Sequence, residues 1–144
     1  MSDVQTFATS RRAHLRWDVG LWSAQIALAL LYGTSGIMNT FMAPESLVSI
    51  GMNYVTDIPH WLLRFIGISE LAGTAGVILP ALLRIMPNLT PLAALGFTTI
   101  QVLAIGFHSM RGEFAEMAPL NLAMLALSLF VLWGRTRKAP VSPR

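Results

Sequence analysis

The sequence predicts an all-α transmembrane protein, a four-helix bundle with both termini in the cytoplasm. Four long apolar stretches fill most of the 144 residues, and hydrophobic residues make up 54% of the chain. Charged residues make up only 12%, against about 25% in a typical soluble domain. Each stretch approaches the roughly 20 residues that a helix needs to cross the hydrocarbon core. We therefore expect a multi-pass protein of the cell (inner) membrane, with the lipid bilayer as its first partner.

The transmembrane domain is expected over residues 20–136. Its helices are expected at about 21–41, 60–83, 91–110 and 119–134. Residues 1–19 precede the domain as a cytoplasmic segment, and its first ten residues are expected to be disordered or to lie at the membrane surface. Residues 137–144 follow the fourth helix as a cytoplasmic tail that frays in solvent. The longest connection, residues 42–60, is moderately apolar, and it is expected to hold a short amphipathic helix or to cap the bundle.

Prolines mark three of the expected helix boundaries. Pro91 and Pro119 suit the first turns of the third and fourth helices, where the missing N–H has no helical partner. Pro80 lies near the end of the second helix, and we expect it to bend or terminate that helix because its ring clashes with the preceding turn.

The basic residues predict the orientation. Eight of the ten lysines and arginines fall before the first helix, between the second and third helices, or after the fourth. With four spans these segments lie on one side, which the positive-inside rule assigns to the cytoplasm. The net charge is only +3, and the basic residues follow membrane topology, so nucleic acid is not an expected partner.

Polar residues recur seven positions apart within the apolar stretches. Seven residues make nearly two turns of an α-helix, so the members of each set share one face. The sets are Gln25, Tyr32 and Asn39; Gln101 and His108; and Asn121, Ser128 and Arg135. The second stretch carries His60, Arg64, Glu70 and Thr74 instead. Polar groups are costly in lipid, so we expect them to converge on a shared pocket with a function.

The depth of each residue follows from the rise of about 1.5 Å per helical residue. Mid-membrane depth is expected for Tyr32, Glu70, Gln101 and Ser128. The outer half is expected to hold Asn39, His60, Arg64, His108 and Asn121. The half towards the termini is expected to be almost purely apolar, so the pocket opens towards the outer face. The expected binding residues are Tyr32, Asn39, Gln101, Asn121 and Ser128.

Glu70, His108 and Arg64 are the candidate catalytic residues. Glu70 either joins helices through a hydrogen bond to Gln101 or Tyr32, or serves a pocket or proton transfer, because a carboxylate at mid-membrane is costly. Glu70 and Arg64 are six positions apart, about 120° around the helix, so each is expected to reach another helix. Arg64 either extends to the headgroups, forms a salt bridge to an outer acid, or donates to an anion, carbonyl or quinone oxygen. His108 is either an interfacial residue or a proton donor and acceptor.

The chain has no cysteine, which excludes disulfides and cysteine-ligated zinc or iron–sulfur clusters within it. There is no HExxH motif or paired-histidine pattern, and no metal site is predicted. No covalently bound cofactor is predicted either. A redox role therefore requires a bound molecule such as quinone, or a partner subunit that supplies electrons.

Several segments resemble a known family. The sequence LRFIGISELAG at 63–73, followed by GVILP at 76–80, is similar to the second helix of DoxX-like membrane proteins of the DoxX/DoxD-like superfamily. The resemblance continues through LTPLAALG at 89–96, IGFH at 105–108, RGE at 111–113, Asn121 and Gly134-Arg135, and loosely through 32–41. It covers about residues 20–136.

The resemblance implies a four-helix membrane bundle in which Arg64, Glu70 and His108 are the characteristic polar positions. Members of the family often carry a lysine shortly after the glycine of the first helix, where this chain has Asn39. Asn39 supplies no charge, which leaves the protonation state of Glu70 open. Members have been linked to quinone-coupled sulfur oxidation and to membrane oxidoreductase complexes.

The expected function is therefore that of a component of a quinone-linked or other membrane oxidoreductase system. One alternative is a cofactor-free acid–base enzyme, of the isomerase or cyclase type, that acts on a lipophilic small molecule. Another is a non-catalytic lipid-binding or transport subunit. Whether the chain is itself an enzyme stays open at this point. A redox partner subunit and a homodimer are further expected partners, since small residues on the helix faces favour close association.

Overall fold

The computed structural model describes residues 2–144, with side chains described from residue 11 onward, and Met1 lies outside this part of the chain. The described residues form helices and connections and contain no strand. In chain order the elements are α1 (Ser2–Phe41), α2 (Pro44–Ser49), the 3-10 helix η1 (Asn53–Thr56), α3 (His60–Leu83), α4 (Leu89–Met110) and α5 (Phe114–Arg137).

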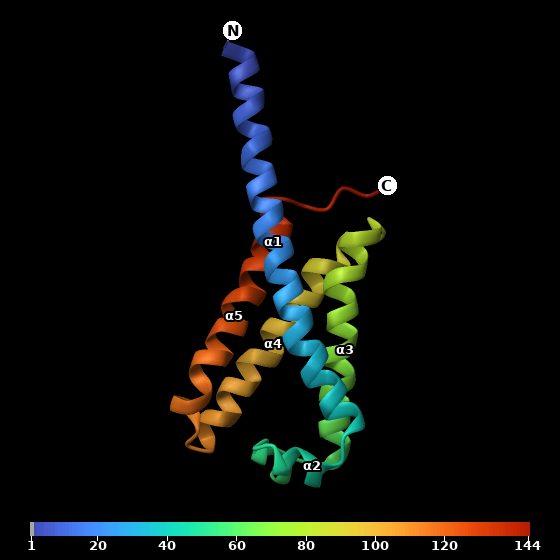
Figure 1. Cartoon of the computed structure of the whole chain (residues 1–144), viewed down its shortest axis with the longest axis vertical. Helices are drawn as coiled ribbons and strands as arrows, with labels where there is room; N and C mark the ends of the chain where they lie inside the picture. The colour runs from blue at the N-terminus through green and yellow to red at the C-terminus, as the bar shows by residue number, and fades with distance from the viewer. Residues whose placement is uncertain (1) are drawn as a thin grey trace.

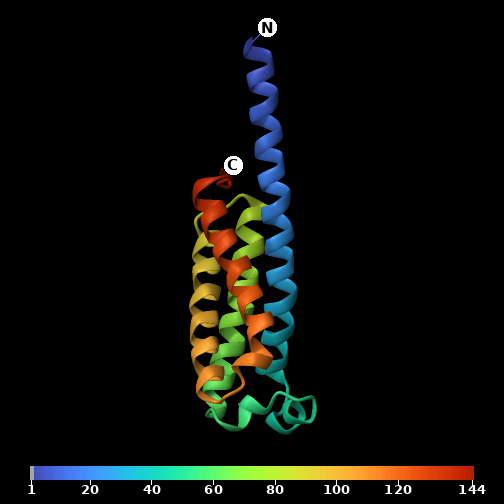
Figure 2. The same cartoon turned by 90° about the vertical axis from the view of Figure 1, so that its left-hand side faces the viewer.

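The predicted fold class is confirmed by four helices that are long and apolar enough to cross a membrane. These spans are Arg11–Phe41, His60–Leu83, Leu89–Met110 and Phe114–Arg137. The four helices run side by side, both termini lie at one end of the bundle, and α2 lies at the other (Figures 1 and 2). The cytoplasmic location of the terminal end remains a prediction from the basic residues.

Around the bundle the order is α1, α3, α4 and α5, because α1 packs against α3 and α5 while α4 packs against the same two helices. The core is apolar, and its centre holds an aromatic pair from diagonal helices. The rings of Tyr32 and Phe97 are stacked, with centroids 3.8 Å apart and planes 5° from parallel. Large apolar side chains such as Leu30, Phe65 and Leu103 are exposed on the outside, as contact with lipid requires.

The contact between α1 and α5 is concentrated near the termini. There the ring centroids of Trp17 and Trp133 lie 5.4 Å apart, and Leu21 packs beneath Gly134. Towards the end that carries α2, the two helices diverge, and α1 stays beside α3 (Figure 1). Of the neighbouring helices, α1 and α5 are therefore the least closely packed pair.

Several predicted boundaries were wrong. Helix α1 begins at Ser2 instead of near residue 21, although nothing is described of the side chains before residue 11. Helix α5 begins at Phe114 instead of at Pro119 and continues through that proline. The carbonyl that loses its N–H partner belongs to Ala115, an exposed residue in the first turn of α5. Helix α3 spans His60–Leu83, the bounds expected for the second helix, and includes Pro80.

The segment between α1 and α3 caps one end of the bundle. This is one of the two arrangements expected for it from the sequence. Its apolar side chains Leu47 and Val55 are buried together with Leu63 of α3. Met38, Met42, Met52, Tyr54 and Ile58 pack around this small second core. The segment is thereby held against the bundle, and Tyr54 is brought next to α1 and α4.

Candidate functional site

Glu70 lies on the face of α3 that packs against α1, and it is only 5% exposed. The Ser35 hydroxyl lies 3.0 and 3.1 Å from its two carboxyl oxygens. Asn39 donates from Nδ2 to Glu70 Oε2 over 3.1 Å. Ser35 and Asn39 are four residues apart, so both face α3 from successive turns of α1. The buried carboxyl group is thus held by two neutral side chains from a neighbouring helix.

Two glycines allow α1 and α3 to approach closely beside this carboxyl group. A Cβ atom added at Gly67 would lie 2.8 Å from the backbone nitrogen of Thr40 and 2.9 Å from the carbonyl carbon of Asn39. A Cβ atom at Gly36 would lie 3.0 Å from the carbonyl oxygen of Gly67. The helix backbones therefore touch at this level, which brings Asn39 within reach of Glu70.

Tyr54, from η1, fixes the orientation of the Asn39 amide. Its hydroxyl donates to Asn39 Oδ1 over 2.8 Å, which leaves Nδ2 of the same amide directed at Glu70. Burial raises the pKa of Tyr54 to about 12, so the phenol keeps its proton and remains a donor at neutral pH. Asn39 therefore links η1 to Glu70 through two hydrogen bonds.

Arg64 also reaches α1, one and a half turns of α3 away from Glu70. Its Nη1 donates to the backbone carbonyl of Asn39 over 2.8 Å. Neither Arg64 nor Glu70 takes part in an ion pair among residues 11–144. The expectation that each reaches across to another helix is confirmed, and both meet α1 at Asn39.

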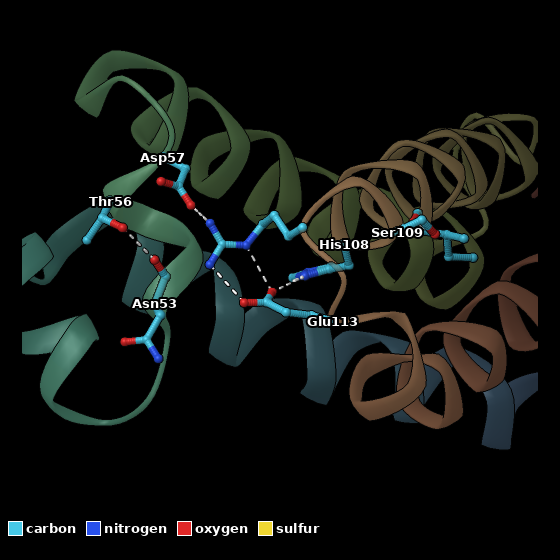
Figure 3. A network of polar contacts seen from close by, with 8 residues as sticks. Asn53, Thr56, Asp57, His108, Ser109 and Glu113 are labelled. Carbon is cyan, nitrogen blue, oxygen red and sulfur yellow. Dashed lines mark hydrogen bonds and ion pairs between the residues drawn. The ribbon is translucent and has the colours of Figure 1, made fainter.

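His108 belongs to a charged cluster at the end of α4 (Figure 3). Its Nδ1 lies 3.2 Å from Glu113 Oε2, and Arg111 donates to both oxygens of Glu113 over 2.9 and 2.8 Å. Arg111 also pairs with Asp57, which follows η1. The hydrogen bond from Arg111 and then that from His108 lower the pKa of Glu113 to about 2. The imidazole of His108 meets the Tyr54 ring edge-on, with centroids 6.0 Å apart.

The remaining predicted residues lie elsewhere in the bundle. The Tyr32 hydroxyl donates to the carbonyl of Phe97 over 3.2 Å and lies near the side chains of Gln101 and Ser128. Gln101 Nε2 lies 3.4 Å from the sulfur of Met124, while its Oε1 is buried without a partner among the described residues. Within residues 11–144 the side chain of Asn121 forms no hydrogen bond, and its exposure is intermediate.

The model of the DoxX-like family matches residues 23–131, about three quarters of the chain. The chain belongs to the DoxX-like family. With its four apolar helices, it is an integral membrane protein. No curated protein and no solved structure matches this DoxX-like chain. The match includes every residue of the Glu70 and His108 groups, and it ends before Arg135.

In this DoxX-like protein the predicted residues form three groups instead of one continuous pocket. The first contains Asn39, Arg64 and Glu70; the second contains His108; the third contains Tyr32, Gln101 and Ser128. The expected hydrogen bond from Glu70 to Gln101 or Tyr32 was wrong, because α1 presents Ser35 and Asn39 to the carboxyl group instead. Tyr54 is the connection between the first two groups.

Ser35 and Tyr54 contact Glu70 and Asn39, but neither was expected at the site from the sequence. Ser35 lies three residues after Tyr32 and four before Asn39, so the helical period places it on the same face. Tyr54 lies in a loop segment, and the sequence carries no periodic signal that places a loop residue. The expectation of an apolar half towards the termini was also wrong, since Gln25 and Arg135 are buried there.

The chemistry available at Glu70 follows from its partners. A carboxyl group with neutral donors on one side can accept or release a proton, and the guanidinium of Arg64 nearby can donate to an oxygen atom. No group of three or more potential metal-binding side chains occurs among the described residues. The arrangement suits proton exchange and hydrogen bonding to an uncharged, oxygen-bearing molecule.

Proposed function

We propose that this DoxX-like protein is a component of a quinone-linked or other membrane oxidoreductase system, in which Glu70 exchanges a proton with a lipophilic redox molecule. The proposal rests on the burial and the hydrogen-bond partners of Glu70. Its carboxyl group is buried between two membrane-spanning helices and is held by Ser35 and Asn39 without a cation. A carboxyl group that is not locked in an ion pair is free to take part in proton transfer.

The groups beyond Glu70 hold its carboxyl group in place. Asn39 joins Glu70 to the Tyr54 hydroxyl, and the Tyr54 ring contacts His108, which is paired with Glu113 at the end of the bundle. Reduction of a quinone takes up two electrons and two protons. In this proposal a partner redox subunit supplies the electrons, and Glu70 delivers the protons one at a time and is reprotonated from the aqueous phase between the two transfers.

The packing of the helices limits how a substrate could reach Glu70 from the membrane. Helices α1 and α3 are in backbone contact at Gly36 and Gly67. A flat lipophilic molecule would therefore not approach Glu70 between these two helices. Arg64 donates to Asn39 through Nη1 only, so its guanidinium is the nearby donor for a carbonyl oxygen.

The experiment is a binding measurement with a quinone analogue on the protein in nanodiscs. Quenching of tryptophan fluorescence reports the affinity for wild type, Glu70→Gln and the matched control Glu45→Gln, since Glu45 is an exposed acid on α2. We expect Glu70→Gln to weaken binding about tenfold, the effect of losing one good hydrogen bond to a buried partner, and Glu45→Gln to leave it unchanged. Equal affinity in all three proteins would refute the proposal.

A second candidate function is supported by the hydrogen bond between His108 and Glu113. A carboxylate that holds one imidazole nitrogen orients the other for general acid–base catalysis, so a cofactor-free isomerase acting on a lipophilic substrate is the alternative. This version needs no electron donor. It requires that His108→Gln and Glu70→Gln each abolish turnover by the isolated chain, whereas the redox proposal predicts turnover only with the partner subunit.

A further inference from the structure

The end of the bundle that carries both termini lies opposite α2 (Figure 1). A basic cavity lies at this end. Its volume is about 860 Å³, and it is lined by the early turns of α1, the ends of α3 and α5, and the tail after α5. Four arginines line it against one acid, Asp18. The arginines are Arg11, Arg12, Arg84 and Arg135, with His14 beside them.

Arg135 is built into the wall of this cavity. Its side chain is only 2% exposed, and it donates from Nε to Gln25 Oε1 over 2.7 Å and from Nη1 to Asp18 Oδ1 over 2.6 Å. Gln25 is itself held by a hydrogen bond of 2.6 Å to the carbonyl of Val77. The second terminal nitrogen, Nη2, is buried without an acceptor among the described residues. A buried donor without a partner is costly, so an anionic oxygen bound there would be stabilised.

The other arginines of the cavity add positive charge that the protein does not neutralise. Asp18 pairs with Arg135, whereas Arg11, Arg12 and Arg84 form no ion pair among residues 11–144. All three side chains are exposed at the rim. Several cations that surround one buried guanidinium are suited to a phosphate group, which accepts hydrogen bonds from more than one donor.

Apolar side chains form another part of the same wall. Leu15 of α1 and Leu82 of α3 line the cavity and are 65% and 60% exposed. Trp22 lies beneath the Arg135 guanidinium, 5.7 Å from its centre. The cavity is located where three membrane-spanning helices end, which is the level of lipid headgroups. Cations and exposed leucines at this level fit an amphiphile better than a free ion.

We propose that this cavity binds the phosphate headgroup of an anionic phospholipid, with Arg135 and the arginines of the rim on the phosphate and an acyl chain beside Leu15 and Leu82. Free phosphate shares the headgroup chemistry but gains nothing from the apolar wall. The site is separate from Glu70 and does not depend on the function proposed for that residue.

The test uses the full chain purified in a neutral detergent. Native mass spectrometry measures binding of short-chain phosphatidylglycerol, short-chain phosphatidylcholine and inorganic phosphate. The variant Arg12→Gln/Arg84→Gln removes two rim charges, and Arg16→Gln/Arg137→Gln removes two charges at the same end that do not line the cavity. All four residues are exposed, so helix content by circular dichroism is expected to stay unchanged.

We expect saturable binding of phosphatidylglycerol that weakens about 30-fold in the rim variant, since each basic residue at an anionic surface contributes a factor of about five. The control variant should bind as wild type does. Equal binding of phosphatidylcholine, or an equal loss in the control variant, would overturn the proposal. Inorganic phosphate that binds as tightly as the lipid would overturn it in favour of a soluble anion.

Discussion

The substitution Gly67→Ala tests the contact that positions Glu70. The added Cβ atom would lie 2.5 Å from the hydroxyl of Thr40 and 2.8 Å from its backbone nitrogen, whereas ordinary contacts begin at 3.4 Å. Because the obstacle includes the backbone of α1, no rotation of a side chain relieves the overlap. The two helices must therefore separate by about 0.5 Å or more at this level.

The separation acts directly on the hydrogen bond to Glu70. Asn39 Nδ2 and Glu70 Oε2 are 3.1 Å apart, and a further half ångström or so takes the pair beyond hydrogen-bonding distance. Overpacking costs about 1–3 kcal/mol and one lost hydrogen bond about 1 kcal/mol, offset by about 1 kcal/mol of helix propensity gained by alanine. The expected net loss in the free energy of unfolding is about 1–3 kcal/mol.

The assay is reversible unfolding in mixed micelles, with Gly106→Ala as the matched control. A Cβ atom at Gly106 of α4 meets nothing within 4 Å, so that variant should be neutral or gain up to about 1 kcal/mol from helix propensity. If Gly67→Ala proved as stable as Gly106→Ala, the close contact between α1 and α3 would not exist as described, and the placement of Asn39 beside Glu70 would be refuted.

Two further predictions concern the end of the bundle that carries α2. Tyr54→Phe removes the donor to Asn39 Oδ1 and should lower the free energy of unfolding by about 1–3 kcal/mol, because it leaves a buried acceptor unpaired. If Tyr54→Phe unfolded at the same denaturant concentration as wild type, the hydrogen bond between Tyr54 and Asn39 would be contradicted. Glu113 has its pKa lowered from 4.5 to about 2, so its contribution to stability is complete above pH 4.5 and is lost as the pH falls towards 2. The melting temperature of wild type should therefore fall between pH 4.5 and pH 2 by more than that of Glu113→Gln. If the two proteins had identical melting temperatures across this range, the charged cluster would be excluded as a source of the acid destabilisation.

The number of helices and their inward faces were predictable from the sequence because both follow from periodicity. Runs of apolar residues gave the four spans. The seven-residue spacing of Gln25, Tyr32 and Asn39 predicted the inward face of α1, and all three side chains are buried. The same spacing predicted an inward face for Ser128 and Arg135 of α5, which are also buried.

The hydrogen-bond partners on neighbouring helices were not predictable. Periodicity shows which face of a helix points inward, but it does not fix the axial position of one helix relative to another. Glu70 was placed level with Tyr32 and Gln101, yet the close approach at Gly67 sets α3 so that Glu70 meets Ser35 and Asn39. The role of Tyr54 depends on how the segment between α1 and α3 folds back over the bundle, for which the sequence gives no spacing rule. Likewise, Pro119 was taken as a helix start, although α5 accommodates it one turn further in.

Proton exchange at Glu70, as proposed above, can be followed by infrared difference spectroscopy of the protein in nanodiscs, recorded while a bound quinone analogue is reduced in the presence of an electron donor. We expect a carboxyl C=O band that changes intensity on reduction, shifts in deuterium oxide and disappears in Glu70→Gln but not in Glu45→Gln. A spectrum that is the same in wild type and Glu70→Gln would contradict the proposed role of Glu70.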